Sequence, residues 1–459
     1  MLSDTQIVST PAESRPKPYG PKGKPAVSPK SAVSPIRSNL TWMVAGTVWS
    51  GFCQWALLVV LAKFGTVDMV GTFTLGLAIT LPVLMFSCLN LRNLYVTDCS
   101  NVYRFREYLA LRLLMAAGSV AFTVACVLLE RQSRNLVIAI ALISLAKAIE
   151  YISDMLYALL QRQELMTAMS ISMMLRGTLS LCILTLGVYL SGSLVWGAAG
   201  LVLASALTLL AFDVPVSLAL LNFRLQDAVT ACRGYLSALS GDLNVEYGRL
   251  RSLALAGAPL GLVLMLVSLN LNIPRYFVER SLGIGEQGIF SSLANLMAAG
   301  SVVISALGQC ATPRLAKSYA AGDMGAFGAL LWMLVTASLV LGGAGLAVAV
   351  TFGHQALALV YRPEYAARQD VFIWLMAASG ALYLGSTMGV AMTAVRCLTP
   401  QLPLFALAAL TTAATCFFLV PAMGLRGAAL SIFISAIVQC AGGAWLLRNA
   451  CRVNARKRG

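Results

Sequence analysis

The segment AKAIEYISDMLYALLQ, residues 146–161, has the apolar character of a membrane helix but carries three charged side chains. Lys147, Glu150 and Asp154 are spaced three and four residues apart, so a helix places them on one face. Each such charge costs about 2.5–3.5 kcal/mol at the centre of a bilayer. A membrane helix keeps such residues where they face partners or water. The segment therefore predicts a helical membrane protein with a polar interior.

The composition of the whole chain agrees with this prediction. Of its 459 residues, 59% are hydrophobic and 11% are charged, against about 45–50% and about 25% in soluble proteins. The net charge of +15 arises between the apolar segments and at the two ends of the chain. This distribution favours contact with anionic membrane lipids over binding to nucleic acid.

We expect an all-α membrane protein with twelve transmembrane helices in two pseudo-symmetric six-helix lobes around a central cavity. Runs of about 20 or more apolar residues are long enough for helical spans. The predicted spans cover roughly 40–61, 69–91, 107–129, 135–160, 166–190, 194–220, 253–273, 286–311, 327–350, 371–394, 402–421 and 424–447.

The polar stretches divide the chain into five parts. Residues 1–38 are basic and rich in proline, which predicts a disordered cytoplasmic tail. The N-terminal six-helix lobe covers 39–221, and 222–252 form a cytoplasmic linker between the lobes. The C-terminal six-helix lobe covers 253–447, and 448–459 form a basic cytoplasmic tail.

The positive charges predict how the chain crosses the membrane. Most of the 33 lysine and arginine residues lie in the tails and in the loops on the same side as the tails. Short loops rich in these residues stay in the cytoplasm, so both termini are expected there. Arg112 lies at the start of a span and is expected to snorkel towards the membrane surface.

Two short motifs recur in both halves of the chain. FGTVDMVGTF from Phe64 resembles LGIGEQGIF from Leu282, and GAAGLVLAS from Gly197 resembles GAALSIFIS from Gly427. Parallel repeats of this kind indicate a transporter with its site between two bundles near the membrane midplane. The alternative is that small residues recur in any set of membrane helices.

The sequence offers little for catalysis or metal binding. The eleven cysteines form no C-x-x-C pair, and His354 is the one histidine. The loops contain no His/Asp/Glu cluster, P-loop or D-x-D motif. We therefore expect a protein that is not an enzyme and that needs no cofactor or metal.

Residues 272–323 read NIPRYFVERSLGIGEQGIFSSLANLMAAGSVVISALGQCATPRLAKSYAAGD. This stretch resembles the seventh-to-eighth-span region of bacterial oligosaccharide flippases, which belong to the multidrug/oligosaccharidyl-lipid/polysaccharide exporter superfamily. The residues that carry the resemblance are Pro274, Arg275, Tyr276, Gly283, Gly288, Ile289, Phe290, Ala306, Leu307, Gly308, Gln309, Pro313, Arg314, Leu315, Gly322 and Asp323.

The resemblance implies a transporter of the bacterial cytoplasmic (inner) membrane. Its cargo would be a polyprenyl-pyrophosphate-linked oligosaccharide, flipped from the inner to the outer leaflet by alternating access. The glycan would serve exopolysaccharide, capsule or O-antigen biosynthesis, beside a polymerase and export complex, with one chain as the transport unit. Many relatives carry an acidic residue where this chain has Pro274, so no ion site is carried over to that position.

Five residues are candidates for binding such a cargo. Arg176 lies about ten residues, or about 15 Å, into its span, and its planar fork suits phosphate oxygens. Lys147 and Arg275 are further cations for the phosphates, although Arg275 also fits a place facing the outer water. Asn270 and Gln309 suit sugar hydroxyls, and polar contacts between helices explain Gln309 equally well.

Glu150, Asp154 and Asp213 are candidates for coupling transport to a gradient of H+ or Na+, since no nucleotide-binding motif is present. Lys147 can pair locally with Glu150, which leaves Asp154 in need of a cation or a proton. Three structural alternatives stay open. Arg176 can form a salt bridge to Glu150 or Asp154, the charged stripe can serve packing alone, or Asp213 can be solvated near the cytoplasmic mouth.

Three other functions are possible for a membrane protein of this kind, but the sequence fits each of them less well. A multidrug or toxin exporter of the same superfamily would carry cationic cargo, which favours acidic residues over Arg176, Lys147 and Arg275 in the cavity. A membrane glycan polymerase or ligase would need a large outer loop with catalytic groups, and the outer loops are short. A scaffolding protein would not need charges at membrane depth.

Overall fold

The computed structural model describes residues 29–98, 102–129, 133–220, 247–395 and 400–456. Within these ranges the chain forms helices and short connections, without a β-strand. The helices are α1 (Pro29–Phe64), α2 (Val67–Ser87), α3 (Leu91–Thr97), α4 (Phe105–Leu129), α5 (Arg134–Arg162), α6 (Met166–Ser191), α7 (Leu194–Thr208), a π-helix (Leu209–Asp213), α8 (Val214–Leu220), α10 (Tyr247–Leu282), α11 (Ile284–Ala321), α12 (Met324–Val360), α13 (Pro363–Ala366), α14 (Gln369–Ala394), α15 (Gln401–Met423) and α16 (Leu425–Arg456).

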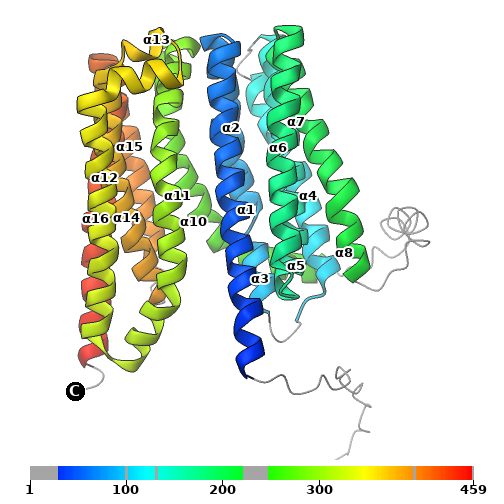
Figure 1. Cartoon of the computed structure of the whole chain (residues 1–459), viewed down its shortest axis with the longest axis vertical. Coiled ribbons are helices and arrows are strands. Elements are labelled where there is room, and N and C mark those ends of the chain that lie inside the picture. The colour runs from blue at the N-terminus through cyan, green and yellow to red at the C-terminus, as the bar shows by residue number, and fades with distance from the viewer. Residues whose placement is uncertain (1–28, 99–101, 130–132, 221–246, 396–399, 457–459) are drawn as a thin grey trace, which may run out of the picture.

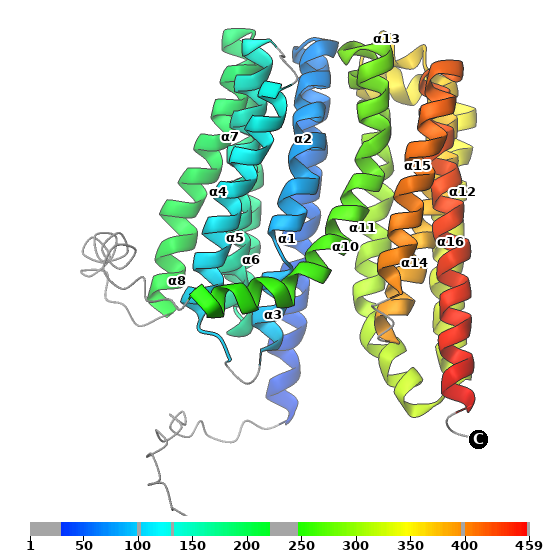
Figure 2. The same cartoon turned by 180° about the vertical axis from the view of Figure 1, so that it is seen from behind.

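These helices form two bundles that stand side by side (Figure 1). Helices α1 to α8 form the N-lobe and α10 to α16 form the C-lobe, and each lobe contributes six of the twelve segments long and apolar enough to cross a membrane. The predicted fold class is therefore confirmed. We name the two ends of the molecule the α3 end and the α13 end, after the short helices found there (Figure 2).

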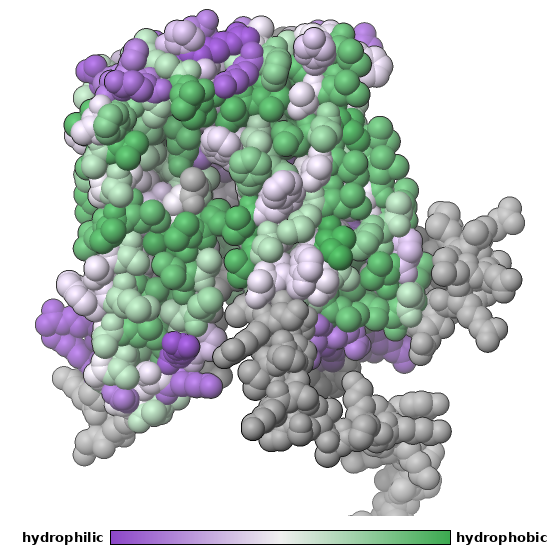
Figure 3. Space-filling view, in the orientation of Figure 1, coloured by the Kyte–Doolittle hydropathy of each residue, from purple (hydrophilic) through white to green (hydrophobic). Residues whose placement is uncertain are grey.

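The lateral surface of the molecule is apolar. Figure 3 shows hydrophobic side chains over most of one face, with hydrophilic ones gathered at the two ends. Large apolar residues such as Trp332, Phe418 and Trp445 are exposed on this lateral surface. Such exposure is unfavourable in water but not against lipid chains. The chain is therefore a multi-pass membrane protein.

Three helices extend into segments that the sequence predicted as tails or linker. Helix α1 begins at Pro29, inside 1–38, and α16 continues to Arg456, inside 448–459. Helix α10 begins at Tyr247, inside the predicted linker. The remaining parts of these segments, 1–28, 221–246 and 457–459, lie outside the described residues. A change to polar composition marks the edge of the membrane rather than the end of a helix, since helices continue past it.

Helix α10 ties the two lobes together at the α3 end. Its first turns run across the base of the N-lobe before the helix bends upwards into the C-lobe (Figure 2). Arg249 pairs with Glu107 at 3.2 Å, and Leu253 is buried in a cluster with N-lobe residues that include Tyr108. Pro259 lies inside α10 and removes one backbone hydrogen bond, which accounts for the bend.

The lobes also meet near the α13 end, where α2 crosses α11. A Cβ added to Gly71 would lie 2.1 Å from the carbonyl oxygen of Ile284, and one added to Gly288 would lie 2.4 Å from that of Val67. The two glycines therefore let the helix backbones touch. Close by, Lys63 and Arg362 donate hydrogen bonds to carbonyls of the opposite lobe at 3.1 and 2.7 Å. The two lobes are therefore in direct contact at the α13 end.

Candidate functional site

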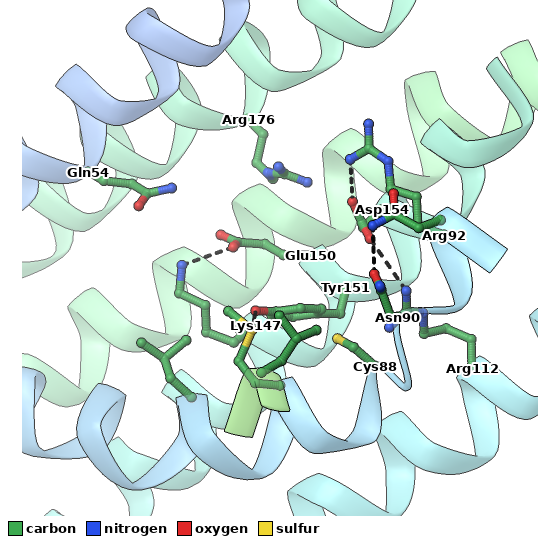
Figure 4. A pocket seen from close by; sticks show the side chains of 14 residues that line it. Gln54, Cys88, Asn90, Arg92, Arg112, Lys147, Glu150, Tyr151, Asp154 and Arg176 are labelled. Carbon is green, nitrogen blue, oxygen red and sulfur yellow. Dashed lines mark hydrogen bonds and ion pairs between the residues drawn. The ribbon is translucent and has the colours of Figure 1, made fainter. Parts of the chain in front are cut away.

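A polar cavity of about 470 Å³ lies in the N-lobe, and we call it the N-lobe pocket. Its walls come from α1 to α6 and from the turn before α3, with Leu264 of α10 as the contribution of the C-lobe (Figure 4). Burial of this many polar side chains requires partners or water. The charged residues that line it are Arg92, Arg112, Lys147, Glu150, Asp154 and Arg176.

Asp154 is the centre of the ion pairs in this pocket. It accepts a hydrogen bond from Arg92 at 2.7 Å and lies 3.4 Å from the nearest nitrogen of Arg112 (Figure 4). Arg92 also donates to Gln161 at 3.0 and 3.1 Å. One carboxylate therefore serves two guanidinium groups, and the cluster keeps a net positive charge.

The predicted position of Arg112 at the membrane surface is wrong. This residue does not snorkel to the membrane surface, because its side chain is only 2% exposed and turns towards Asp154 on the adjacent helix. Two of its nitrogens, Nε and Nη1, have no hydrogen-bond partner among the described residues. The position of Arg112 relative to Asp154 depends on how α4 packs against α5, and no local sequence signal contains that information.

Arg92 was also missed as a site residue, since the sequence places it in a loop beyond the second span. The chain turns sharply there, because Leu89 and Asn90 both adopt positive φ, at 47° and 52°. Asparagine tolerates this conformation, whereas a leucine does so at a cost of about 1–3 kcal/mol. The turn leads into α3, from which Arg92 reaches back to Asp154.

Lys147 and Glu150 pair at 2.9 Å, as their spacing predicted. Arg176 points into the same space (Figure 4) but forms no ion pair with a described residue. Its Nη1 has no hydrogen-bond partner among these residues, and its guanidinium lies over the ring of Tyr157 at 5.6 Å. The predicted alternative of a salt bridge from Arg176 to Glu150 or Asp154 is not formed in this conformation.

A smaller cavity of about 190 Å³ continues from the N-lobe pocket towards the C-lobe, and we call it the middle pocket. It shares Lys147, Glu150 and Arg176 with the N-lobe pocket. Its far side is formed by Arg275 and Asn295. Arg275 donates to Asn272 at 2.9 Å and has no carboxylate partner among the described residues. Arg275 thus adds a further positive charge where the lobes meet.

A third cavity of about 580 Å³, the C-lobe pocket, begins at the same Arg275 and Asn295. Asn270 lines it, but the side-chain oxygen of Asn270 accepts hydrogen bonds from Thr412 and from Ser435. Asn270 therefore also fastens α10 to α15 and α16. The side chain of Gln309, the remaining cargo candidate, lies outside the part of the chain that the structure describes.

Asp213 lies away from the three pockets, in the π-helix that interrupts the sixth span. The predicted alternative of a solvated residue at the mouth is wrong, because Asp213 is 0% exposed. It accepts a hydrogen bond from Ser172, whose hydroxyl lies 2.7 Å from that of Tyr157. Because the ring of Tyr157 packs against the guanidinium of Arg176, contacts through Ser172 and Tyr157 link Asp213 to the cavity. The second carboxylate oxygen of Asp213 has no partner among the described residues.

Several known proteins share this architecture. No protein-family model matches the sequence. Solved structures that share the fold include an inward-facing and an outward-facing conformation of a multidrug resistance MATE family transporter of the MOP superfamily. Their TM-scores are 0.64 and 0.61, both at 14% identity, over 92% and 94% of this chain and 96% and 98% of those chains. The chain has the fold of the MOP superfamily of exporters.

Two further proteins are similar to this chain. A MOP superfamily transporter from Pyrococcus furiosus, described as having a binding pocket of reverse polarity, matches with a TM-score of 0.62 and 14% identity over 91% of this chain and 96% of that one. The capsular polysaccharide biosynthesis protein CapF of Staphylococcus aureus is 24% identical over 405 residues, which are 87% of this chain and 96% of CapF. The resemblance to the exporter superfamily is confirmed.

The ion pairs of Asp154 lead to a prediction about stability. Asp154→Ala leaves Arg112 buried with no carboxylate, so the free energy of unfolding is expected to fall by about 3–5 kcal/mol. The exposed pair of Arg426 and Asp370 provides a control, because Asp370→Ala is expected to cost less than about 1 kcal/mol. Denaturant titration in detergent micelles measures both variants. Equal losses in the two variants would contradict the importance assigned to Asp154.

Proposed function

We propose that this protein flips a polyprenyl-pyrophosphate-linked oligosaccharide from the inner to the outer leaflet of the bacterial cytoplasmic membrane. One observation carries the proposal: among the described residues that line the N-lobe and middle pockets, five cations face two carboxylates. Such an excess suits an anionic headgroup and opposes a cationic drug. The cations are Arg92, Arg112, Lys147, Arg176 and Arg275.

The five cations divide into two groups by what they already bind. Arg92, Arg112 and Lys147 form ion pairs with Asp154 or Glu150. Arg176 and Arg275 have no such partner among the described residues, so a pyrophosphate can complete their hydrogen bonding. A charged guanidinium in a cavity is stabilised by a bidentate phosphate more than by any neutral group. We assign Arg176 and Arg275 to the headgroup.

The relatives support a role in surface polysaccharide synthesis. CapF is named for capsular polysaccharide biosynthesis, and it aligns with most of this chain. The fold alone does not separate the two functions, because its similarity to MATE transporters supports multidrug extrusion as strongly as it supports flipping of a lipid-linked glycan. The charge balance of the pockets favours the flippase, and exopolysaccharide, capsule and O-antigen pathways all fit. One chain acts as the transport unit, and a polysaccharide polymerase or export complex would receive its product.

In the proposed orientation, the α3 end and both termini face the cytoplasm, in keeping with the positive charges of the loops. The crossing of Gly71 and Gly288 then closes the outer side, and cargo enters from the inner leaflet. Alternating access requires this crossing to separate so that the headgroup is released outside. The basic tails would contact anionic membrane lipids.

Energy for transport is proposed to come from a gradient of H+ or Na+, with Glu150, Asp154 and Asp213 as the coupling candidates. Asp213 is the best placed of the three for a proton, because it is buried without a cation in contact and has one free oxygen. Tyr157 and Ser172 connect it with Arg176, so the charge of the cavity can influence its protonation.

Replacement of Arg176 tests the headgroup site. Purified protein is reconstituted into liposomes with a short-chain polyprenyl-pyrophosphate oligosaccharide labelled on its sugar, and exposure of the label is followed over time. Arg176→Gln is expected to slow flipping by about tenfold to a hundredfold, because a charged hydrogen bond contributes about 1.5–3 kcal/mol. Arg280→Gln, an exposed position on the same helix as Arg275, is expected to leave the rate unchanged. Flipping by Arg176→Gln at the normal rate would remove Arg176 from the site.

Replacement of Asp213 tests the coupling. Asp213→Asn keeps the size of the side chain and its acceptor for Ser172, so the protein is expected to fold and to flip its cargo. Stimulation of flipping by an imposed proton gradient is expected to disappear. The same gradient should still accelerate the exposed control Asp370→Asn. An undiminished response of Asp213→Asn to the gradient would exclude Asp213 as the coupling residue.

A further inference from the structure

The C-lobe pocket differs from the N-lobe pocket in the chemistry of its walls. It is lined by α10, α11, α14, α15 and α16, and the charged residue among its described lining residues is Arg275 at its entrance. No carboxylate of the described chain lines it. The remaining polar groups are uncharged, and apolar side chains such as Phe405 lie between them. The polar lining residues are Asn270, Asn295, Ser301, Ser305, Tyr383, Ser386 and Gln439.

Some of these polar groups are used by the fold. Besides Asn270, Tyr383 donates its hydroxyl hydrogen to the carbonyl of Met297 at 2.7 Å. Ser301 donates to the carbonyl of Ala298, also at 2.7 Å. The contact of Tyr383 joins α14 to α11, that of Asn270 joins α10 to α15 and α16, and that of Ser301 lies within α11. They shape the pocket, but they leave these groups with little capacity for a ligand.

Other polar groups in the pocket are free to bind. The side chains of Ser305, Ser386 and Gln439 make no hydrogen bond to any other residue that the structure describes. The side-chain nitrogen of Asn295 is buried without a partner in the same part of the chain. An amide offers both donors and acceptors, and a hydroxyl does likewise. A ligand rich in hydroxyl groups matches this set, whereas a carboxylate or phosphate would lack cations beyond Arg275.

Space in the pocket is left by glycines of α14 that helix packing does not require. A Cβ added to Gly389 would meet nothing within 4 Å, and one added to Gly385 would make ordinary contacts with Gln439 at 3.4 Å and Cys440 at 3.7 Å. By contrast, Gly300 on α11 is needed for packing, since its Cβ would lie 2.2 Å from the hydroxyl of Tyr383. The open wall at Gly389 and the unpaired polar groups are independent observations of one cavity.

We propose that the C-lobe pocket is a saccharide subsite, which binds the uncharged sugars next to the pyrophosphate of the cargo. This inference rests on the proposed function. The middle pocket and the C-lobe pocket are neighbours, because Arg275 and Asn295 line both. A pyrophosphate held near Arg176 and Arg275 therefore directs the first sugars of the chain into the C-lobe pocket. The protein selects a neutral glycan there, and an acidic sugar at this place is disfavoured because it would find no further cation.

The proposal is tested by measuring how much a sugar adds to the affinity. The full chain in nanodiscs is titrated with three ligands. The first is bare geranyl pyrophosphate, the second is geranyl pyrophosphate linked to a neutral disaccharide, and in the third a uronic acid replaces one sugar of that disaccharide. The neutral disaccharide is expected to tighten the binding of wild type by at least about tenfold, since several hydrogen bonds form. The uronic acid ligand is expected to gain less.

Variants separate the subsite from the headgroup site. Gly389→Phe fills the pocket and is expected to abolish the tenfold gain while the affinity for bare geranyl pyrophosphate stays within twofold. Gln439→Ala, which adds no bulk, is expected to reduce the gain by several fold. The matched control is Gly343→Phe on α12, where a Cβ also meets nothing within 4 Å and the position lies outside the pockets. This control should behave as wild type.

The possible outcomes are distinct. If wild type binds bare geranyl pyrophosphate but the disaccharide adds nothing, the saccharide subsite is excluded and the proposed function stands. A gain that survives both Gly389→Phe and Gln439→Ala also excludes it, as does equal or tighter binding of the uronic acid ligand. If wild type binds none of the three ligands, the proposed function fails and the subsite fails with it.

Discussion

The structure of the site depends on how charges are kept at membrane depth. Asp154 is shared by Arg92 and Arg112, which come from different helices, so three segments of the N-lobe are held by one carboxylate. A buried arginine cannot lose its charge, and hydrocarbon offers it no hydration. The pairs therefore restrict how α3, α4 and α5 can pack. Because cations outnumber carboxylates, the same arrangement leaves a positive cavity that the protein itself does not neutralise.

The two lobes differ in the chemistry of their pockets, and they contact each other at both ends of the molecule. The N-lobe carries most of the cavity charge, whereas the C-lobe lines its pocket with neutral amides and hydroxyls. Glycines at the crossing of α2 and α11 bring the lobes into backbone contact at the α13 end. At the α3 end, the first turns of α10 lie against the N-lobe through Arg249 and Leu253. In the proposed transport cycle, a rocking motion of the lobes would separate the glycine contact while α10 keeps the lobes connected.

Periodicity and composition predicted the features that depend on one helix at a time. The twelve spans, the six-and-six division and the local pair of Lys147 with Glu150 all follow from spacing along the chain. The contacts of Asp154 could not be predicted in this way, because Arg92 reaches it through a turn at Asn90 and Arg112 through the register of a neighbouring helix. The burial of Asp213 likewise depends on a π-helix and on Ser172, which is 41 residues away.

The excess of cations in the cavity suits an anionic headgroup, as proposed. The decisive measurement offers both kinds of cargo to the same proteoliposomes: a short-chain polyprenyl-pyrophosphate oligosaccharide and a lipophilic cationic dye, each followed by its own label. The excess of cations predicts that the pyrophosphate lipid crosses the membrane at a rate above that of empty liposomes, while the dye does not. Extrusion of the dye without flipping of the lipid would contradict the account and place the protein among the multidrug exporters.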